Sequence, residues 1–387
     1  MLSISLRTSA LALLIAIASG CGGGSSTITQ SNPAPVAACV PSSKLEFAYA
    51  LGGSNFNSNG TISSFTVNSC TGDLSPTNPP TVATGADPED MVVDRLGRFA
   101  YAANLVSNAS DEATISMYTI DPNTGILAPT TPATVPTGFF PQGIGIDPLG
   151  RFVYTANSDD NTISMFTINQ STGVLTPTTP PSVASGWSPL SITVDPSGRF
   201  AYAANQDDGT ISMYTIDSTT GVLTPMSPSI AQAGVSPFGV TLTPNGKFAY
   251  VPNAYSANNS ISQYTVDSTT GVLTPVTSSV VSAGNNPTSV AVDPSSKFAF
   301  VTNRLDNSIS MFQIDPDTGN LSPNGTVFAG QTPFRMVFDP SGKFAYVANE
   351  GSAVSVFTLN SDGTLIAPPV NLEDNGFLAI AVTATKQ

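Results

Sequence analysis

Hydrophobic and polar residues follow a pattern that returns about every 50 residues along most of the chain. In the clearest unit, four short runs have the alternation and the β-branched and aromatic residues that are typical of strands. These runs cover residues 191–196, 199–205, 210–217 and 221–225. The two middle runs are apolar on both faces, so the sheet that they form must be covered on both sides.

Two sequence markers count the repeated units. An aromatic anchor opens the second run of each unit, at Phe47, Phe99, Phe152, Phe200, Phe248, Phe298 and Phe344. A glycine follows each anchor, mostly within Thr-Gly-x-Leu, at Gly72, Gly125, Gly173, Gly221, Gly271, Gly319 and Gly363. Seven units of four strands with this period predict an all-β fold, a seven-bladed β-propeller with four antiparallel strands per blade.

The two ends of the repeated region complement each other. The first unit begins at its second strand, and residues 377–384 (FLAIAVTA) have the pattern of a first strand. We therefore expect the C-terminal strand to join the N-terminal blade and close the ring, which leaves only short sheet edges. An open solenoid would instead need polar caps at its ends.

The N-terminus has the features of an export signal. Residues 1–20 contain one charge, Arg7, followed by a short apolar run that is typical of a signal peptide. The run ends in Ala-Ser-Gly before Cys21, which resembles a bacterial lipobox. We expect a lipid anchor on Cys21, a flexible tether over residues 21–42, the propeller over 43–387, and a location in the cell envelope. The alternative is an ordinary secretory signal with an incidental cysteine.

Two further cysteines flank the first pair of strands. Cys39 precedes the first strand and Cys70 follows the second, so an antiparallel hairpin brings the two thiols near each other. An exported protein meets an oxidising environment, and a Cys39–Cys70 disulfide is the favoured prediction. The alternative is two free, buried thiols.

Charge and composition exclude several classes of function. The net charge is −14, and the 12 basic residues are too few to form the basic face of a nucleic-acid-binding protein. The chain has no histidine, which removes the Ser-His-Asp and Cys-His catalytic arrangements. We expect no cofactor, and we expect a monomer.

The repeat motifs resemble those of a known family. FAYVAN, NTISMFTI, TGVLTP and SVAVDPSSKF are similar to motifs of the lactonase-like seven-bladed propellers, which include 6-phosphogluconolactonase and carboxymuconate-cyclising enzymes. The related YVTN-repeat surface propellers look similar too. The resemblance covers residues 43–387 and implies the fold. The enzymes of this family use His with Arg and Glu, so their catalytic set cannot be carried over to a chain without histidine.

The first strands of the units line the channel of a propeller, and their opening residues lie at one mouth of it. The equivalent positions hold Asp90, Gly143, Ser191, Gly239, Ser289, Arg335 and Ala379. Five of these residues are small, whereas Asp90 and Arg335 are charged and stand two blades apart. Repeated Asp-x-x-x-Arg/Lys pairs occupy the turns at the other end of the channel, and we interpret those pairs as structural.

Other candidate residues gather on the face of Asp90 and Arg335. Glu89 neighbours Asp90, Arg304 begins a turn on that face, and the connections between blades add Phe139, Phe140 and Trp187. One interpretation is a small-molecule site in which the arginines hold a carboxylate or lactone oxygen, a carboxylate acts as acid or base, and the aromatic residues form a wall. The other interpretation is that Asp90 and Arg335 form an ion pair across the mouth, in which each charge is the partner of the other.

Acidic turns on the same face offer a third kind of chemistry. They contain Asp111, Glu112, Asp159, Asp160, Asp207, Asp208 and Asp306. Calcium needs six or more oxygens, which no single turn supplies, so ordinary turn chemistry is favoured over a metal site.

Three functions remain open from the sequence. The leading prediction is an exported propeller that binds a small molecule or a protein partner. The alternatives are a hydrolase acting on a lactone or sugar acid, and a structural protein of a surface assembly. Polar, non-repeated residues that converge at the channel would favour the enzyme.

Overall fold

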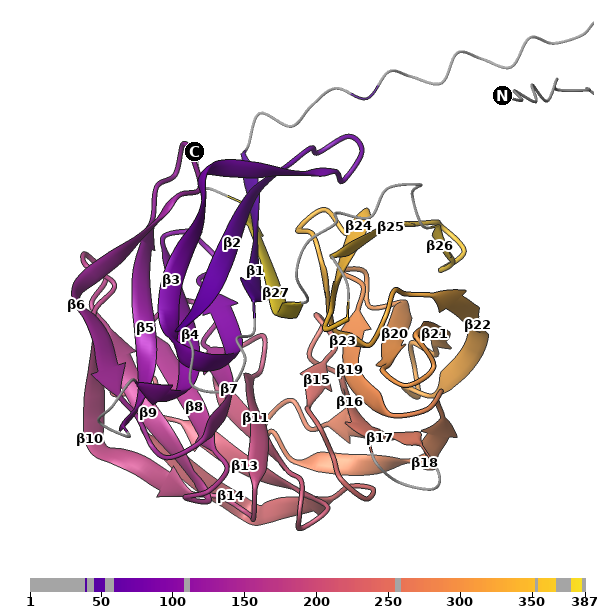
Figure 1. The fold of residues 1–387 in the computed structure, drawn as a ribbon. Helices are drawn as coiled ribbons and strands as arrows, with labels where there is room; N and C mark the ends of the chain where they lie inside the picture. Colours follow the sequence, from indigo (N-terminus) through magenta and orange to yellow (C-terminus); the bar gives the residue numbers. More distant parts are fainter. Residues whose placement is uncertain are drawn as a thin grey trace, which may run out of the picture. The chain divides into compact units, whose positions relative to one another are not determined.

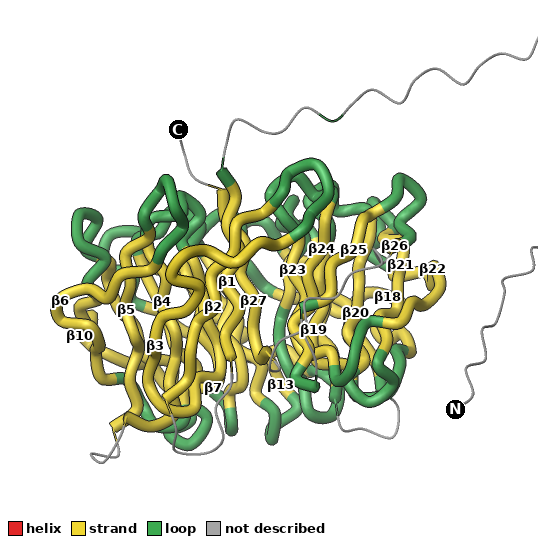
Figure 2. Tube along the Cα trace, turned by 45° about the horizontal axis from the view of Figure 1, so that its top comes forward, coloured by secondary structure: helices red, strands yellow, loops and turns green. Residues whose placement is uncertain are grey.

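A computed structural model describes residue 39 and residues 45–52, 59–107, 112–254, 259–351, 354–366 and 377–384. This part of the chain consists of strands, turns and loops arranged as a ring around a central channel (Figure 1). Among these residues we find no helix with the length and apolar character needed to span a membrane. The strands run between two faces of the ring, and loops cover both faces (Figure 2).

The strands form seven antiparallel four-stranded blades. Five blades are separate sheets, and two are joined into one seven-stranded sheet because the long strand β3 serves both of them. We number the blades from 1, which contains the first strand, to 7. In order from blade 1, the innermost strands are β27 (Phe377–Ala384), the second half of β3 (Leu74–Val93), β7 (Pro141–Ile146), β11 (Pro189–Val194), β15 (Thr241–Leu242), β19 (Pro287–Val292) and β23 (Pro333–Phe338).

The other three strands of each blade lie progressively farther from the channel. The second strands are β1 (Glu46–Gly52), β4 (Phe99–Ser107), β8 (Phe152–Asn157), β12 (Phe200–Asn205), β16 (Phe248–Asn253), β20 (Phe298–Asn303) and β24 (Phe344–Asn349). The third strands are β2 (Asn59–Val67), β5 (Glu112–Ile120), β9 (Thr162–Ile168), β13 (Thr210–Ile216), β17 (Ser260–Val266), β21 (Ser308–Ile314) and β25 (Ser355–Leu359). The outer strands are the first half of β3, β6 (Leu127–Pro136), β10 (Leu175–Ala184), β14 (Leu223–Gln232), β18 (Leu273–Ser282), β22 (Leu321–Phe328) and β26 (Leu365–Ile366).

The predicted ring closure is confirmed. Strand β27 pairs antiparallel with β1, in a register that places Tyr49 opposite Ala381. It also lies beside the innermost strands of both neighbouring blades, β23 and β3. Figure 1 shows the C-terminal strand, in yellow, beside the indigo N-terminal strand. The blade is therefore completed by segments from opposite ends of the sequence.

The two sequence markers meet at the seams between blades. A side chain on Gly125 of blade 2 would come within 2.3 Å of the Phe47 ring of blade 1, and the equivalent glycines lie equally close to the preceding anchors. Two residues after six of the seven anchors, a tyrosine donates a hydrogen bond of 2.6–3.0 Å to the carbonyl of the same glycine, in Tyr49–Gly125, Tyr101–Gly173, Tyr154–Gly221, Tyr202–Gly271, Tyr250–Gly319 and Tyr346–Gly72. The seventh anchor, Phe298, has Phe300 at this position. The markers therefore hold each blade against the next.

The turns between the first and second strands are built by their aspartates, as the sequence predicts. Asp147 is almost completely buried and accepts hydrogen bonds from the backbone N–H groups of Arg151 and Phe152. The Arg151 side chain adds an ion pair with a distance of 2.8 Å, and its guanidinium lies over the Phe152 ring. Arg98 forms the same ion pair with Asp94, whereas Arg199 and Lys343 donate to the backbone carbonyls of Ser268 and Cys70 in a neighbouring blade, so these repeated charges serve the turns and the contacts between blades.

Candidate functional site

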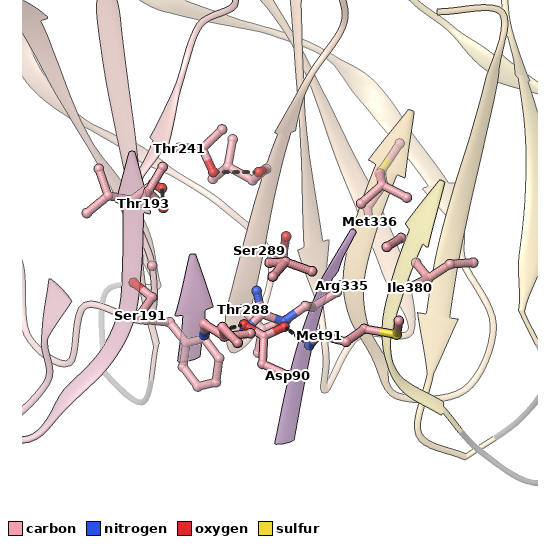
Figure 3. A pocket seen from close by; sticks show the side chains of 18 of the residues that line it. Asp90, Met91, Ser191, Thr193, Thr241, Thr288, Ser289, Arg335, Met336 and Ile380 are labelled. Atoms are coloured by element: carbon pink, nitrogen blue, oxygen red, sulfur yellow. Dashed lines mark hydrogen bonds and ion pairs between the residues drawn. The ribbon is translucent and has the colours of Figure 1, made fainter. Parts of the chain in front are cut away.

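A cavity of about 420 Å³ occupies one end of the central channel (Figure 3). The innermost strands line it, and four of the equivalent opening positions of these strands contribute polar side chains: Asp90, Ser191, Ser289 and Arg335. The Ser191 hydroxyl oxygen is buried and has no hydrogen-bond partner among the described residues. The cavity therefore contains a polar group that no described residue satisfies.

Asp90 and Arg335 form an ion pair across the mouth of this cavity. The distance from Arg335 Nη2 to Asp90 Oδ2 is 2.9 Å, although the two residues belong to blades 2 and 7 (Figure 3). Blade 1 lies between them and presents the small residue Ala379 at the same level. The Asp90–Arg335 ion pair, which was one of the two interpretations of the sequence, is therefore present. Arg335 Nε remains buried without a partner in the described part of the chain.

The Asp90 carboxylate is held tightly in place. It accepts hydrogen bonds from the backbone N–H groups of Met91 at 2.9 Å and Ile144 at 3.2 Å. Burial raises its pKa, and the neighbouring Arg335 charge and the two backbone donors oppose that shift. Asp90 therefore serves to fix Arg335 at the mouth.

Glu89 is the carboxylate with the properties of an acid–base group. It is partly buried at the start of the same innermost strand. Burial, together with the nearby negative charges of Asp90, Asp87 and Glu350, raises its pKa to about 7 against the opposing effect of Arg335. A carboxyl group with this pKa exchanges protons near neutral pH.

Arg304 forms an ion pair with Glu350, a residue that the sequence analysis did not single out. Its Nε lies 2.8 Å from Glu350 Oε2, and the guanidinium stands 5.9 Å from the centre of the Phe334 ring. Arg304 and Glu350 both directly follow the asparagine that ends the second strand, in blades 6 and 7. The signal was available in the sequence, because Arg and Glu replace the uncharged residues Ser158, Gln206 and Ala254 at this position.

The aromatic residues divide into two groups. Phe238 lines the cavity, and its ring packs edge-to-face against Phe334 with centroids 5.4 Å apart. Phe334 is the second residue of β23, and Phe238 holds the equivalent repeat position shortly before β15; the sequence analysis did not consider this position. Phe139, Phe140 and Trp187 are exposed on the connections between blades and are not among the residues that line the cavity.

The remaining candidates form no metal centre in the described part of the chain, where no three acidic, cysteine or histidine side chains are arranged so that they could hold a metal ion. Asp111 lies outside the described residues, as does the side chain of Glu112. Cys39 and Cys70 are both in the disulfide-bonded form, and their pairing with each other stays a prediction. Cys21 also lies outside the described residues.

Comparison with known proteins identifies the family. The profile of the lactonase family of seven-bladed β-propellers matches residues 60–187, 112–236 and 231–338, which together cover more than half of the chain. The chain belongs to this lactonase family. No curated protein sequence matches this lactonase-family propeller.

Solved structures show the same fold at low sequence identity. A Bacteroides fragilis protein to which 6-phosphogluconolactonase activity is ascribed shares 20% identity, with a TM-score of 0.74 over 88% of this chain and 98% of that one. A periplasmic gluconolactonase of Pseudomonas aeruginosa shares 18% identity, with a TM-score of 0.73 over 88% of this chain and all of the other. At these identities the likeness establishes the fold of this lactonase-family propeller and leaves its substrate to be argued from the site.

Proposed function

We propose that this propeller hydrolyses a lactone of a sugar acid at the charged mouth of its channel. The observation that carries the proposal is the ion pair of Asp90 and Arg335 at one cavity, from innermost strands two blades apart. Glu89 directly precedes Asp90 and lies close enough to both residues for their charges to shift its pKa, although it is not among the residues that line the cavity. All three depart from the residues that the other repeats place there. In a repeat protein, charges outside the repeat have no part in the common fold and point to a specific site.

Each charged group has a role in this proposal. Arg335 donates hydrogen bonds to the lactone carbonyl oxygen, where negative charge develops as water attacks the carbonyl carbon. Glu89 in its carboxylate form takes a proton from that water. When the ring C–O bond breaks, Glu89 returns the proton to the departing oxygen, which becomes the hydroxyl of the product acid. Asp90 positions Arg335 through their ion pair.

Hydrolysis of glucono-δ-lactone by the purified protein tests the proposal. The rate above the spontaneous reaction should rise with pH through about 7, because Glu89 acts in its deprotonated form. A rate no faster than buffer alone, with this lactone and with the corresponding γ-lactone, would count decisively against hydrolysis.

Ligand binding without turnover is the second candidate. The chain has no histidine to supply the family's usual acid–base residue, and the cavity and its arginine suit a carboxylate as well as a lactone. Calorimetric titration with gluconate distinguishes the two, since a pure binding protein takes up the acid and leaves the lactone intact.

We also propose that the protein acts outside the cytoplasm, anchored through Cys21. The lipobox-like run supports this, and the related Pseudomonas aeruginosa protein is a periplasmic one. Cys21→Ser should release the protein from membranes into the soluble fraction. Unchanged processing and unchanged membrane association of this variant would contradict the anchor.

A further inference from the structure

Three consecutive blades each expose a large apolar side chain at one repeat position. These residues are Phe139, Trp187 and Val235, whose exposed fractions are 60%, 67% and 67%. They stand on the connections that lead into the innermost strands of blades 3, 4 and 5. Blades 6 and 7 place the polar residues Asn285 and Gln331 at this position, so the apolar side chains are no requirement of the repeat.

The backbone under the two aromatic side chains is fixed by hydrogen bonds. The Phe139 N–H donates to Asp160 Oδ2 at 2.8 Å, and the Trp187 N–H donates to Asp208 Oδ2 at 2.7 Å. The residue after each ring has a left-handed backbone, with φ of 56° at Phe140 and 54° at Ser188. The carbonyl of each accepts a further backbone bond at 2.9 Å. These rings are therefore presented on rigid supports.

One acidic turn lies between the two rings. Asp160 holds the backbone of Phe139, and the next residue, Asn161, accepts a hydrogen bond of 2.8 Å from the N–H of Ser188, which follows Trp187. Asp159 of this turn is exposed, and Asp207 is exposed beside Trp187. Apolar side chains thus alternate with carboxylates from blade to blade.

We propose that Phe139, Trp187 and Val235 form a binding surface for a neutral oligosaccharide. The polarised C–H groups on the face of a sugar ring favour the negative face of an aromatic ring, and the sugar hydroxyls donate hydrogen bonds to carboxylates. The core of a protein interface is contiguous and poor in charge, whereas the acidic turns of blades 3 and 4 interrupt this surface. The overall charge of −14 disfavours a polyanion.

The surface lies on the connections that lead into the innermost strands at the channel mouth. Trp187 is four residues before Ser191, which lines the cavity, and Phe139 is four residues before Gly143, at the equivalent position. An oligosaccharide on this surface can therefore extend its terminal residue into the mouth, toward Arg335. This last step rests on the proposed function, and it narrows the substrate to a lactone or acid at the end of a sugar chain.

Trp187 is the only tryptophan of the chain, so its fluorescence reports directly on this surface. We expect a saturable change in the emission of the full-length protein on titration with at least one of cellohexaose, laminarihexaose and maltohexaose. Phe139→Ala should weaken that binding by about tenfold. Leu149→Ala removes an equally exposed apolar side chain from a turn on the opposite face and should leave the affinity unchanged.

Three outcomes would overturn the inference. The first is a fluorescence titration that stays flat with all three hexasaccharides. The second is equal weakening by Phe139→Ala and Leu149→Ala. The third is a dimer in sedimentation that Trp187→Ala dissociates, which would assign the surface to a second copy of the chain. Hexasaccharide binding without lactone hydrolysis contradicts only the proposed function, and hydrolysis without hexasaccharide binding contradicts only this inference.

Discussion

The two ends of the channel use the same pair of residue types in different ways. At one end, Asp94 and Arg98 pair at 2.8 Å within a single turn, and the aspartate also accepts the backbone N–H groups of Arg98 and Phe99. At the other end, Asp90 and Arg335 pair at 2.9 Å across two blades, and the arginine keeps a buried Nε without a partner in the described residues. The Asp94–Arg98 pair completes a turn. The Asp90–Arg335 pair leaves an arginine N–H group at the cavity that can still donate a hydrogen bond.

This difference shows how structural and functional charges can be separated in a repeat protein. A charge that recurs in most repeats serves the fold that all of them share. A charge found in one blade cannot serve the common fold, and its burial has to be explained by its surroundings at that one place. The following variants test this distinction.

The largest effect should follow from opening the ring. Deleting residues 377–387 removes the strand that pairs with β1 and leaves two blade faces uncovered. We expect the free energy of unfolding to fall by on the order of 5 kcal/mol or more. If calorimetry finds that the truncated protein melts at the same temperature as the full chain, the pairing of β27 with β1 does not stabilise the ring.

The next effect should come from a repeated turn. Asp147→Ala removes the acceptor of the backbone N–H groups of Arg151 and Phe152 and of Arg151 Nε. We expect a loss of about 3 kcal/mol in chemical denaturation, with no change in lactone turnover. Lost turnover in a variant that remains fully folded would mean that the repeated charges are not purely structural.

Glu89→Gln should reduce turnover and leave the fold intact, which is the opposite of the result expected for Asp147→Ala. The amide cannot accept the proton of the attacking water, so hydrolysis should fall by about 100-fold while the fold persists.

The pKa of Glu89 rises from an ordinary value of 4.5 to about 7 on folding, so the folded state holds this proton more tightly than the unfolded state. The stability of the wild type should therefore decline as pH rises from about 4.5 through 7, and the variant should lack that part of the decline. Identical pH profiles of unfolding would show that Glu89 is not buried as described.

The smallest effect is expected for Arg335→Lys, a substitution at the mouth of the channel. Arg335→Lys keeps the charge near Asp90 and loses the planar fork that grips a carbonyl or carboxylate, so kcat/KM should fall by about tenfold at an unchanged melting temperature. Arg199→Lys, in a repeated turn, is the matched control and should change neither quantity. A lower melting temperature with unchanged kcat/KM in Arg335→Lys would make Arg335 a purely structural partner of Asp90.

Much of the fold was predictable because the repeat displays each feature seven times. The aromatic anchors and glycines gave the number of blades, and residues 377–384 gave the closure. The site was predictable only in part. Asp90 and Arg335 stood out as breaks in the repeat, whereas Glu350 and Phe238 were missed because their positions were not compared across all blades.

The sequence by itself determined the number of blades, the strands within them and the residues that depart from the common pattern, since these depend on local periodicity and turn chemistry. Only the tertiary structure decided which of the departing residues meet. Asp90 and Arg335 lie 245 positions apart in the sequence and touch because closing the ring brings blade 7 within one blade of blade 2. The raised pKa of Glu89 likewise results from burial among charges of different blades, and that environment exists only when the ring is closed.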